Sequence, residues 1–224
     1  MFPLISALED EFRVIAIGVP QGLAHVPDLV QAISQIMTDR GVSDACLLGH
    51  SFGGMLAECF MLQYPERTNG LILANMAHFG TFREIIVRGG LGIAPYLPRE
   101  WVDRQLGSAF HHLLKGCPDQ DFWTSFLASE ITSLGKSAFE NRLDFILDTL
   151  PRYPTKRLDM DAWRRRVLIL ESDREVAFTL PERDALRELY PQAQTHILPA
   201  ASHFSPYCQL DEFVAVTKSF LAQY

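Results

Sequence analysis

The amino-acid sequence predicts an α/β fold on a mainly parallel sheet, with a helical segment inserted between two strands. Short apolar runs alternate with segments of helical periodicity, the pattern of strands covered by helices on both faces. The alternation stops over residues 78–160, which have helical periodicity throughout. At residues 49–53 a serine flanked by glycines stands between a predicted strand and a predicted helix. These three observations define the fold class.

Each expected strand is short and rich in Val, Ile and Leu, and each expected helix repeats apolar residues every three or four positions. The first strand is ended by Pro20, and the helix after it has Pro27 in its first turn and Gly41 beyond its end. We expect strands at residues 13–20, 44–49, 69–76, 166–172 and 194–200, and helices at 27–40, 52–66, 181–190 and 211–224.

The chain is expected to form one core with an inserted cap. Residues 1–77 would form the first part of the α/β core, residues 78–160 a helical cap over the carboxyl edge of the strands, and residues 161–224 the second part of the core. The alternative is a helical subdomain with no role at a site. The cap is rich in large apolar residues, which could line a pocket but are first needed to pack the cap itself: Phe82, Ile85, Ile86, Trp101, Phe110, Phe122, Trp123 and Phe126.

Composition excludes several classes of function. The chain has 224 residues, 48% of them hydrophobic, which is enough for one sizeable core. Its formal net charge of -7 and its lack of a long basic run argue against a nucleic-acid partner. The four cysteines form no C-x-x-C pair, which predicts neither a metal site nor a disulfide framework and favours a reducing cytoplasm. No signal peptide and no membrane-spanning segment is predicted.

The segment Gly49-His50-Ser51-Phe52-Gly53 matches the G-x-S-x-G pattern. Alone the pattern is weak, since it occurs by chance in roughly one chain of ten at this length. Here a strand precedes it and a helix follows, so the serine must occupy a sharp turn that exposes its Oγ. The flanking glycines would allow the close backbone approach of such a turn. The Phe52 N–H, at a helix N-terminus, could donate to a developing oxyanion.

A serine nucleophile needs a base, and His203 is the first candidate because it follows the last predicted strand, at the same edge of the sheet as Ser51. His78 also follows a strand and is the second choice. His50 stands beside the serine and is expected to point elsewhere, although it could line the pocket. The alternative for His203 is an ordinary histidine of a surface loop.

The base needs a carboxylate to fix its tautomer. Glu171, Asp173 and Glu175 all lie near the carboxyl end of the strand 166–172. Periodicity does not choose among them, and each could instead be a solvated turn residue. With any of the three, the order along the chain is serine, acid, histidine.

The order of these motifs over nearly the whole chain resembles the α/β-hydrolase superfamily, through "GHSFGG", "LILAN", "LILESD" and "AASHF". More narrowly, "SLGKSAFENRLDFIL", "LRELYPQAQTHIL" and "SHFSPYC" are similar to maspardin and its bacterial relatives. In the superfamily the catalytic acid usually lies three residues after a small residue that closes its strand. Taking Ser172 as that residue, the resemblance favours Glu175, with Asp173 as the alternative.

The resemblance also implies a second oxyanion donor, on a loop after an earlier strand and often beginning His-Gly. The sequence contains no such segment, so the chain resembles an N-terminally shortened hydrolase whose first strands would lie upstream of Met1. Either Met1 is an internal methionine of a longer reading frame, which we favour, or the sheet closes up. In the superfamily the strand before that loop lies between the strands expected at 13–20 and 44–49, so its absence implies that these two strands pair directly or leave a gap.

These observations predict a serine hydrolase that acts on a small ester or other acyl compound through an acyl-enzyme, without cofactor or metal. Ser51 would attack, His203 would transfer the proton, Glu175 or Asp173 would orient it, and Phe52 would hold the oxyanion. One alternative is a non-catalytic binding protein on the same fold, because maspardin lacks the histidine and is regarded as non-catalytic. Another is cleavage of a carbon–carbon bond or a lactone at the same turn.

Overall fold

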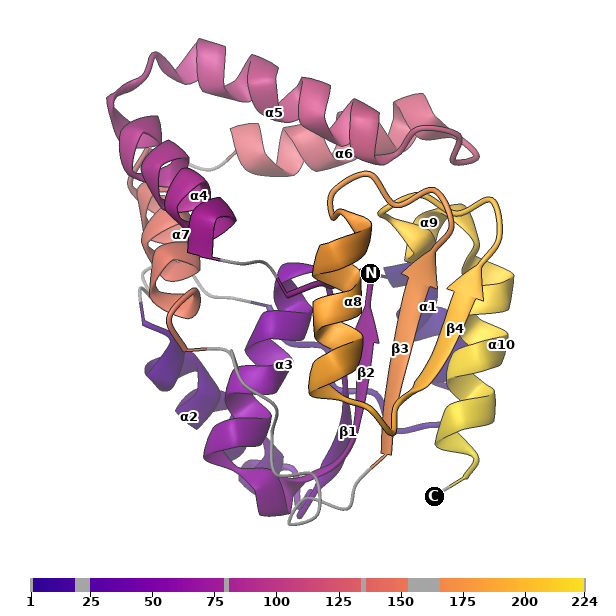
Figure 1. The fold of residues 1–224 in the computed structure, drawn as a ribbon. Helices are drawn as coiled ribbons and strands as arrows, with labels where there is room; N and C mark the ends of the chain where they lie inside the picture. Colours follow the sequence, from indigo (N-terminus) through magenta and orange to yellow (C-terminus); the bar gives the residue numbers. More distant parts are fainter. Residues whose placement is uncertain (1, 19–24, 79–80, 134–135, 153–165, 224) are drawn as a thin grey trace.

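The computed structural model describes residues 2–18, 25–78, 81–133, 136–152 and 166–223. Its centre is a sheet of four parallel strands in the order β1-β2-β3-β4 (Figure 1). The strands are β1 (Ala45–His50), β2 (Thr68–Ala74), β3 (Arg166–Ser172) and β4 (Gln194–Leu198). Because all four run the same way, their carboxyl ends meet at one edge, where the segments after them can share a site.

Helices cover both faces of the sheet (Figure 1). One face packs against α2 (Val26–Asp39), α3 (Phe52–Gln63) and α8 (Leu180–Leu189). The other packs against α1 (Phe2–Leu8) and α10 (Leu210–Leu221). Two short helices, η1 (Pro65–Arg67) and α9 (Ser205–Cys208), complete the core. The predicted fold class is therefore confirmed.

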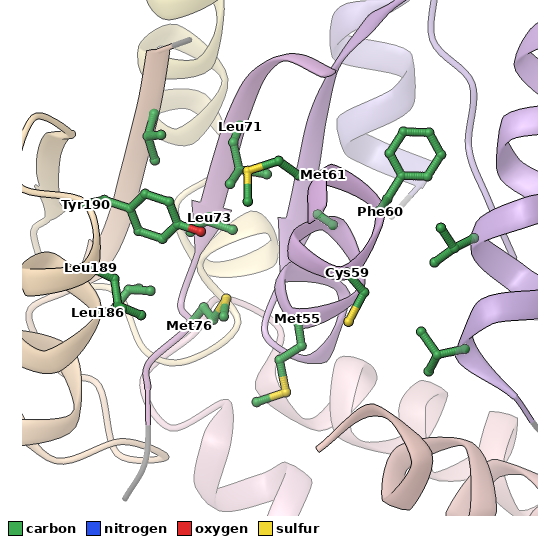
Figure 2. Packing of buried hydrophobic residues seen from close by; sticks show 14 of the residues in the cluster. Met55, Cys59, Phe60, Met61, Leu71, Leu73, Met76, Leu186, Leu189 and Tyr190 are labelled. Carbon is green, nitrogen blue, oxygen red and sulfur yellow. The ribbon is translucent and has the colours of Figure 1, made fainter. Parts of the chain in front are cut away.

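The continuous apolar runs arise because both faces of each central strand are buried. In β2, Leu71 and Leu73 join the hydrophobic cluster with α3 and α8, whereas Ile72 joins the cluster with α10. Figure 2 shows the first cluster, to which α3, β2 and α8 each contribute side chains. Since alternate residues of a strand point to opposite faces, a strand covered on both sides has no polar alternation.

Between β2 and β3 the chain forms a helical insertion. Its helices are α4 (Thr81–Ile93), η2 (Ala94–Tyr96), α5 (Arg99–Leu113), α6 (Gln120–Thr132) and α7 (Lys136–Thr149). It has a small hydrophobic cluster of its own around Val102, Phe139 and Leu143. Figure 1 shows α5 and α6 crossing above the carboxyl ends of the strands. The expected end of the insertion at residue 160 lies outside the described residues.

The strand predicted at residues 13–20 does not form in residues 13–18, the part of it that the structure describes. Residues 13–18 form no strand, and Val14 and Ile17 are 36% and 40% exposed. Among the described residues β1 is hydrogen-bonded only to β2, so the segment has no neighbouring strand to complete its backbone hydrogen bonds. The segment and the end of α2, with Ile36 and Arg40, line a hollow of about 530 Å³. Direct pairing with β1, one of the two expected outcomes, is therefore wrong.

The expectation of no disulfide is also wrong, because Cys117 and Cys208 are bonded, with their Cα atoms 4.5 Å apart. Cys46 and Cys59 are free. The bond joins the turn between α5 and α6 to α9, across a separation of 91 residues. Sequence spacing could not reveal this pair, because only the folding of the insertion back onto the core brings the two sulfur atoms together. Among the described helices, none is long and apolar enough to cross a membrane.

Candidate active site

Ser51 occupies the turn between β1 and α3 with φ of +52° and ψ of -121°. This left-handed conformation is costly for a residue with a side chain, by about 1–3 kcal/mol, and persists only where the surroundings enforce it. The enforcement is visible in the backbone, since the Ser51 N–H donates to the Ala74 carbonyl oxygen at 2.8 Å. The neighbouring strand β2 thus holds the serine, between β1 and α3, in the strained conformation expected of a nucleophile turn.

The two glycines of the motif have different roles. A Cβ added at Gly49 would lie 2.3 Å from the Gly53 carbonyl oxygen, so only glycine fits there. A Cβ added at Gly53 would meet nothing within 4 Å among the described residues, so the expectation that its lack of a side chain is needed is wrong. The second tight position is Gly54, where a Cβ would lie 2.5 Å from the sulfur of Met76. Gly53 contributes to the turn through its backbone carbonyl group, which lies close to Gly49.

Ser51, His203 and Glu175 lie in one hydrogen-bonded line. The Ser51 Oγ is 3.0 Å from the Nε2 of His203, and the Nδ1 of His203 is 3.0 Å from both carboxylate oxygens of Glu175. The side chains of His203 and Glu175 are 5% and 1% exposed. With the Nδ1 proton donated to the carboxylate, Nε2 is free to accept the serine hydroxyl proton.

The other acidic candidates lie elsewhere. Asp173 is exposed, and its backbone N–H donates to the Leu198 carbonyl oxygen. Glu171 is 1% exposed but forms ion pairs with Arg183 and Arg187 of α8. Of the three carboxylates named by the sequence, Glu175 is the one joined to His203.

His78, the second-choice histidine, is buried four residues after the end of β2. Its backbone N–H donates to the Glu182 carbonyl oxygen at 3.0 Å. Burial lowers the pKa of His78, so its ring favours the neutral form. The hydrogen bond to the Ser51 hydroxyl is made by His203.

Glu175 is held in its ionised form by its surroundings. Burial alone would raise its pKa, but hydrogen bonds and charge from His203, the Asn75 amide and the Ala177 N–H together hold the pKa below its ordinary value. Sequence reasoning did not single out Asn75. Its signal was present in "LILAN", where a polar residue directly follows a buried strand at the carboxyl edge of the sheet.

His50 faces the histidine loop, contrary to the expectation that it points elsewhere. Its Nε2 donates to the main-chain oxygen of His203 at 2.8 Å, and the two rings lie 5.2 Å apart. Burial, together with the charge of His203, lowers the pKa of His50 to about 4. The ring is therefore neutral near pH 7 and can keep its Nε2 proton for this hydrogen bond.

Aromatic rings connect the helical insertion to the site. Phe110 of α5 lies 6.3 Å from Phe204, which follows His203, and Phe145 of α7 lies 5.9 Å from Phe52. Other large apolar side chains of the insertion are about half exposed: Ile85, Ile86, Trp101 and Phe122.

Comparison with known proteins identifies the family of the chain. The model of the Alpha/beta hydrolase family matches residues 1–216. The chain belongs to this family. It is 25% identical over 215 residues to the sn-1-specific diacylglycerol lipase ABHD11 of Mus musculus, covering 88% of this chain and 67% of the lipase.

Two solved structures share the fold. A thermophilic esterase from Thermogutta terrifontis has a TM-score of 0.76 at 19% identity, covering 98% of this chain and 83% of the esterase. A meta-cleavage product hydrolase from Pseudomonas fluorescens has a TM-score of 0.66 at 22% identity, covering 99% and 84%. The family supports a hydrolase that acts on a small molecule, whereas the narrower resemblance to maspardin stays a prediction.

Proposed function

We propose that this protein is a serine hydrolase that cleaves a small ester or related acyl compound through an acyl-enzyme. The observation that carries the proposal is the continuous line of hydrogen bonds from Ser51 through His203 to Glu175. A serine hydroxyl is a poor nucleophile alone, and it becomes competent when a neutral imidazole can accept its proton.

In the proposed reaction the Ser51 Oγ bonds to the carbonyl carbon while its proton passes to the Nε2 of His203. The carboxylate of Glu175 stabilises the imidazolium that results. The negative charge on the carbonyl oxygen is met by the Phe52 N–H, which opens α3 and so has no intrahelical partner. The alcohol leaves with the proton from His203. Water then passes a proton to His203 and attacks the acyl carbon, and Ser51 leaves with that proton as the carboxylic acid is released.

We further propose that the helical insertion acts as the cap of the site and supplies an apolar surface for the acyl group. The rings of Phe52, Phe145, Phe110 and Phe204 form two aromatic contacts between the insertion and the segments that carry Ser51 and His203. An esterase and a diacylglycerol lipase among the similar proteins agree with an acyl substrate. Substrates with a longer apolar acyl chain should therefore have a lower KM than acetate esters.

Labelling with a fluorophosphonate probe tests the nucleophile. Wild type and the exposed-serine control Ser129→Ala should label at the same rate, whereas Ser51→Ala should not label and His203→Ala should label much more slowly. Ser129 lies exposed on α6, and its hydroxyl donates to the backbone oxygen of Phe126. Equal labelling of wild type and Ser51→Ala would overturn the assignment. Absence of labelling in wild type would favour a non-catalytic binding protein.

Carbon–carbon bond hydrolysis is the second candidate, because a meta-cleavage product hydrolase shares the fold over nearly the whole chain. The two activities separate in one assay. A panel of nitrophenyl esters of increasing acyl length reports ester cleavage, and the loss of absorbance of a dienoate meta-cleavage product reports carbon–carbon cleavage. A kcat/KM at least tenfold higher for the dienoate would replace the ester proposal.

A further inference from the structure

Asn75 directly follows β2 and is nearly inaccessible to solvent, with 2% of its surface exposed. Its φ is +44°, in the left-handed region, which asparagine tolerates better than most residues with a side chain. Its backbone N–H donates to the Leu170 carbonyl oxygen of β3 at 2.8 Å. The backbone thus fixes the root of this side chain at the carboxyl edge of the two central strands.

The side-chain amide of Asn75 contacts three segments of the chain. Its Nδ2 donates to the Ser172 Oγ at 2.7 Å and to a carboxylate oxygen of Glu175 at 3.0 Å. Its Oδ1 accepts a hydrogen bond from the Ser205 hydroxyl. One amide therefore joins the end of β2, the turn that carries Glu175 and the loop that carries the histidine.

The network determines which way the amide points. The Ser172 hydroxyl donates its only proton to the Ser202 carbonyl oxygen at 2.6 Å, so toward Asn75 the Ser172 oxygen can only accept. The amide nitrogen must therefore face Ser172, and Oδ1 must face Ser205. In this orientation the second amide hydrogen is directed at Glu175, so the donation to the carboxylate follows from the protons available.

We propose that Asn75 is a positioning residue that holds the Glu175 carboxylate in the geometry His203 requires. The inference rests on the proposed function, because it concerns the same proton relay. A glutamate has rotatable side-chain bonds that a turn alone does not fix, and a misplacement of about 1 Å in such a relay can cost on the order of 100-fold in rate. A neutral amide suits this position, because it stabilises the carboxylate while leaving its full charge to stabilise the imidazolium.

A purely architectural role for Asn75 makes a different prediction. If the amide only ties the strands together, its loss lowers stability and slows the reaction by the same factor whether or not Glu175 is present. If it acts through Glu175, its effect on rate disappears once the carboxylate is gone. A double-mutant cycle therefore separates the two roles.

The variants are Asn75→Gly and Asn75→Asp, each made in wild type and in Glu175→Ala. Glycine removes the amide yet accepts the left-handed backbone, and aspartate keeps the side-chain volume while replacing the donor with an acceptor. Aspartate is the variant to use if glycine does not fold. The control is Thr68→Val at the opposite end of β2, which removes the buried hydrogen bond from Thr68 to the Tyr64 carbonyl oxygen.

The measurements are the fluorophosphonate labelling rate, kcat and KM, and the thermal unfolding midpoint. We expect either Asn75 variant to slow labelling about 10- to 100-fold in wild type, with kcat lowered and KM little changed, but less than about threefold in Glu175→Ala. Thr68→Val should lower the unfolding midpoint without slowing labelling. If the Asn75 variants slow labelling equally in both backgrounds, or do not slow it in wild type, the inference about Asn75 is overturned but the proposed function is not. A wild-type protein that never labels would overturn the proposed function as well.

Discussion

Replacing Glu58 with glutamine should remove a large part of the pH dependence of folding stability. Glu58 lies on α3 with 0% of its surface exposed, and Tyr190, directly after α8, donates its hydroxyl proton to Oε1 at 2.6 Å. Among the described residues Oε2 has no hydrogen-bond partner. Burial raises the pKa of Glu58 from 4.5 to about 8, although the bond from Tyr190 lowers it. The folded protein thus keeps a proton that the unfolded chain releases above pH 4.5.

The sign and size follow from this difference in bound protons. Between pH 4.5 and 8 the unfolded state binds fewer protons at this site, so the free energy of unfolding falls as pH rises, by about 1.4 kcal/mol per pH unit. From pH 5.5 to 7.5 wild type should therefore lose about 3 kcal/mol relative to Glu58→Gln. The amide also adds a pH-independent offset of about 1–3 kcal/mol, since its nitrogen lacks an acceptor.

Urea unfolding of both proteins at pH 5.5, 6.5 and 7.5 measures this difference. A difference in unfolding free energy that stays constant across the three pH values would refute the reasoning, whatever its size. Tyr190→Phe is the matched variant. It removes the hydrogen bond that lowers the pKa of Glu58, so the steep region should extend to higher pH than in wild type.

Three further predictions concern the site and its supports. Glu175→Gln should lower kcat on a nitrophenyl ester about 1,000- to 10,000-fold, because an amide that donates to Nδ1 stabilises the wrong imidazole tautomer. The kcat of Asp173→Asn should stay within about threefold of wild type. A larger loss of kcat in Asp173→Asn than in Glu175→Gln would make Asp173 the acid. Gly49→Ala should lower the unfolding midpoint sharply and Gly53→Ala should not, since only the first Cβ meets backbone; equal midpoints would contradict the geometry of the turn. Reduction of the disulfide should cost about 4–5 kcal/mol in urea unfolding, given the 91 residues between its cysteines, and thiol titration of unfolded protein should find two free thiols before reduction and four after it.

The parts of the fold that the sequence predicted well are those whose pattern is local. β2 and β3 read as strands because both of their faces are buried, which leaves an uninterrupted apolar run. The run at residues 13–18 has the same composition and forms no strand, because a strand also needs a neighbour to satisfy its backbone, and composition does not report the neighbour. The disulfide was missed for a related reason, since its partners meet only through tertiary folding.

The candidate site was predicted as a set of residue types at the carboxyl edge, and the structure brings Ser51, His203 and Glu175 into contact. Their catalytic roles remain proposals. The choice of Glu175 over Asp173 came from the resemblance to a family, since both carboxylates follow the same strand and neither periodicity nor spacing separates them. Asn75 was overlooked because a single amide after a strand gives no pattern until the network around it is visible.

The histidine loop is constrained from several independent directions. His50, beside the serine, donates to the main-chain oxygen of His203, and Ser172, at the end of β3, donates to that of Ser202. A disulfide fixes Cys208, five residues beyond His203, to the helical insertion, and the Ser202 Oγ lies 3.0 Å from its sulfur. Each of these bonds has one end on the histidine loop and none includes a Ser51 atom, so weakening any one should displace the His203 ring before it changes the backbone of Ser51. We therefore expect variants along this loop to lower kcat while the serine turn keeps its strained backbone.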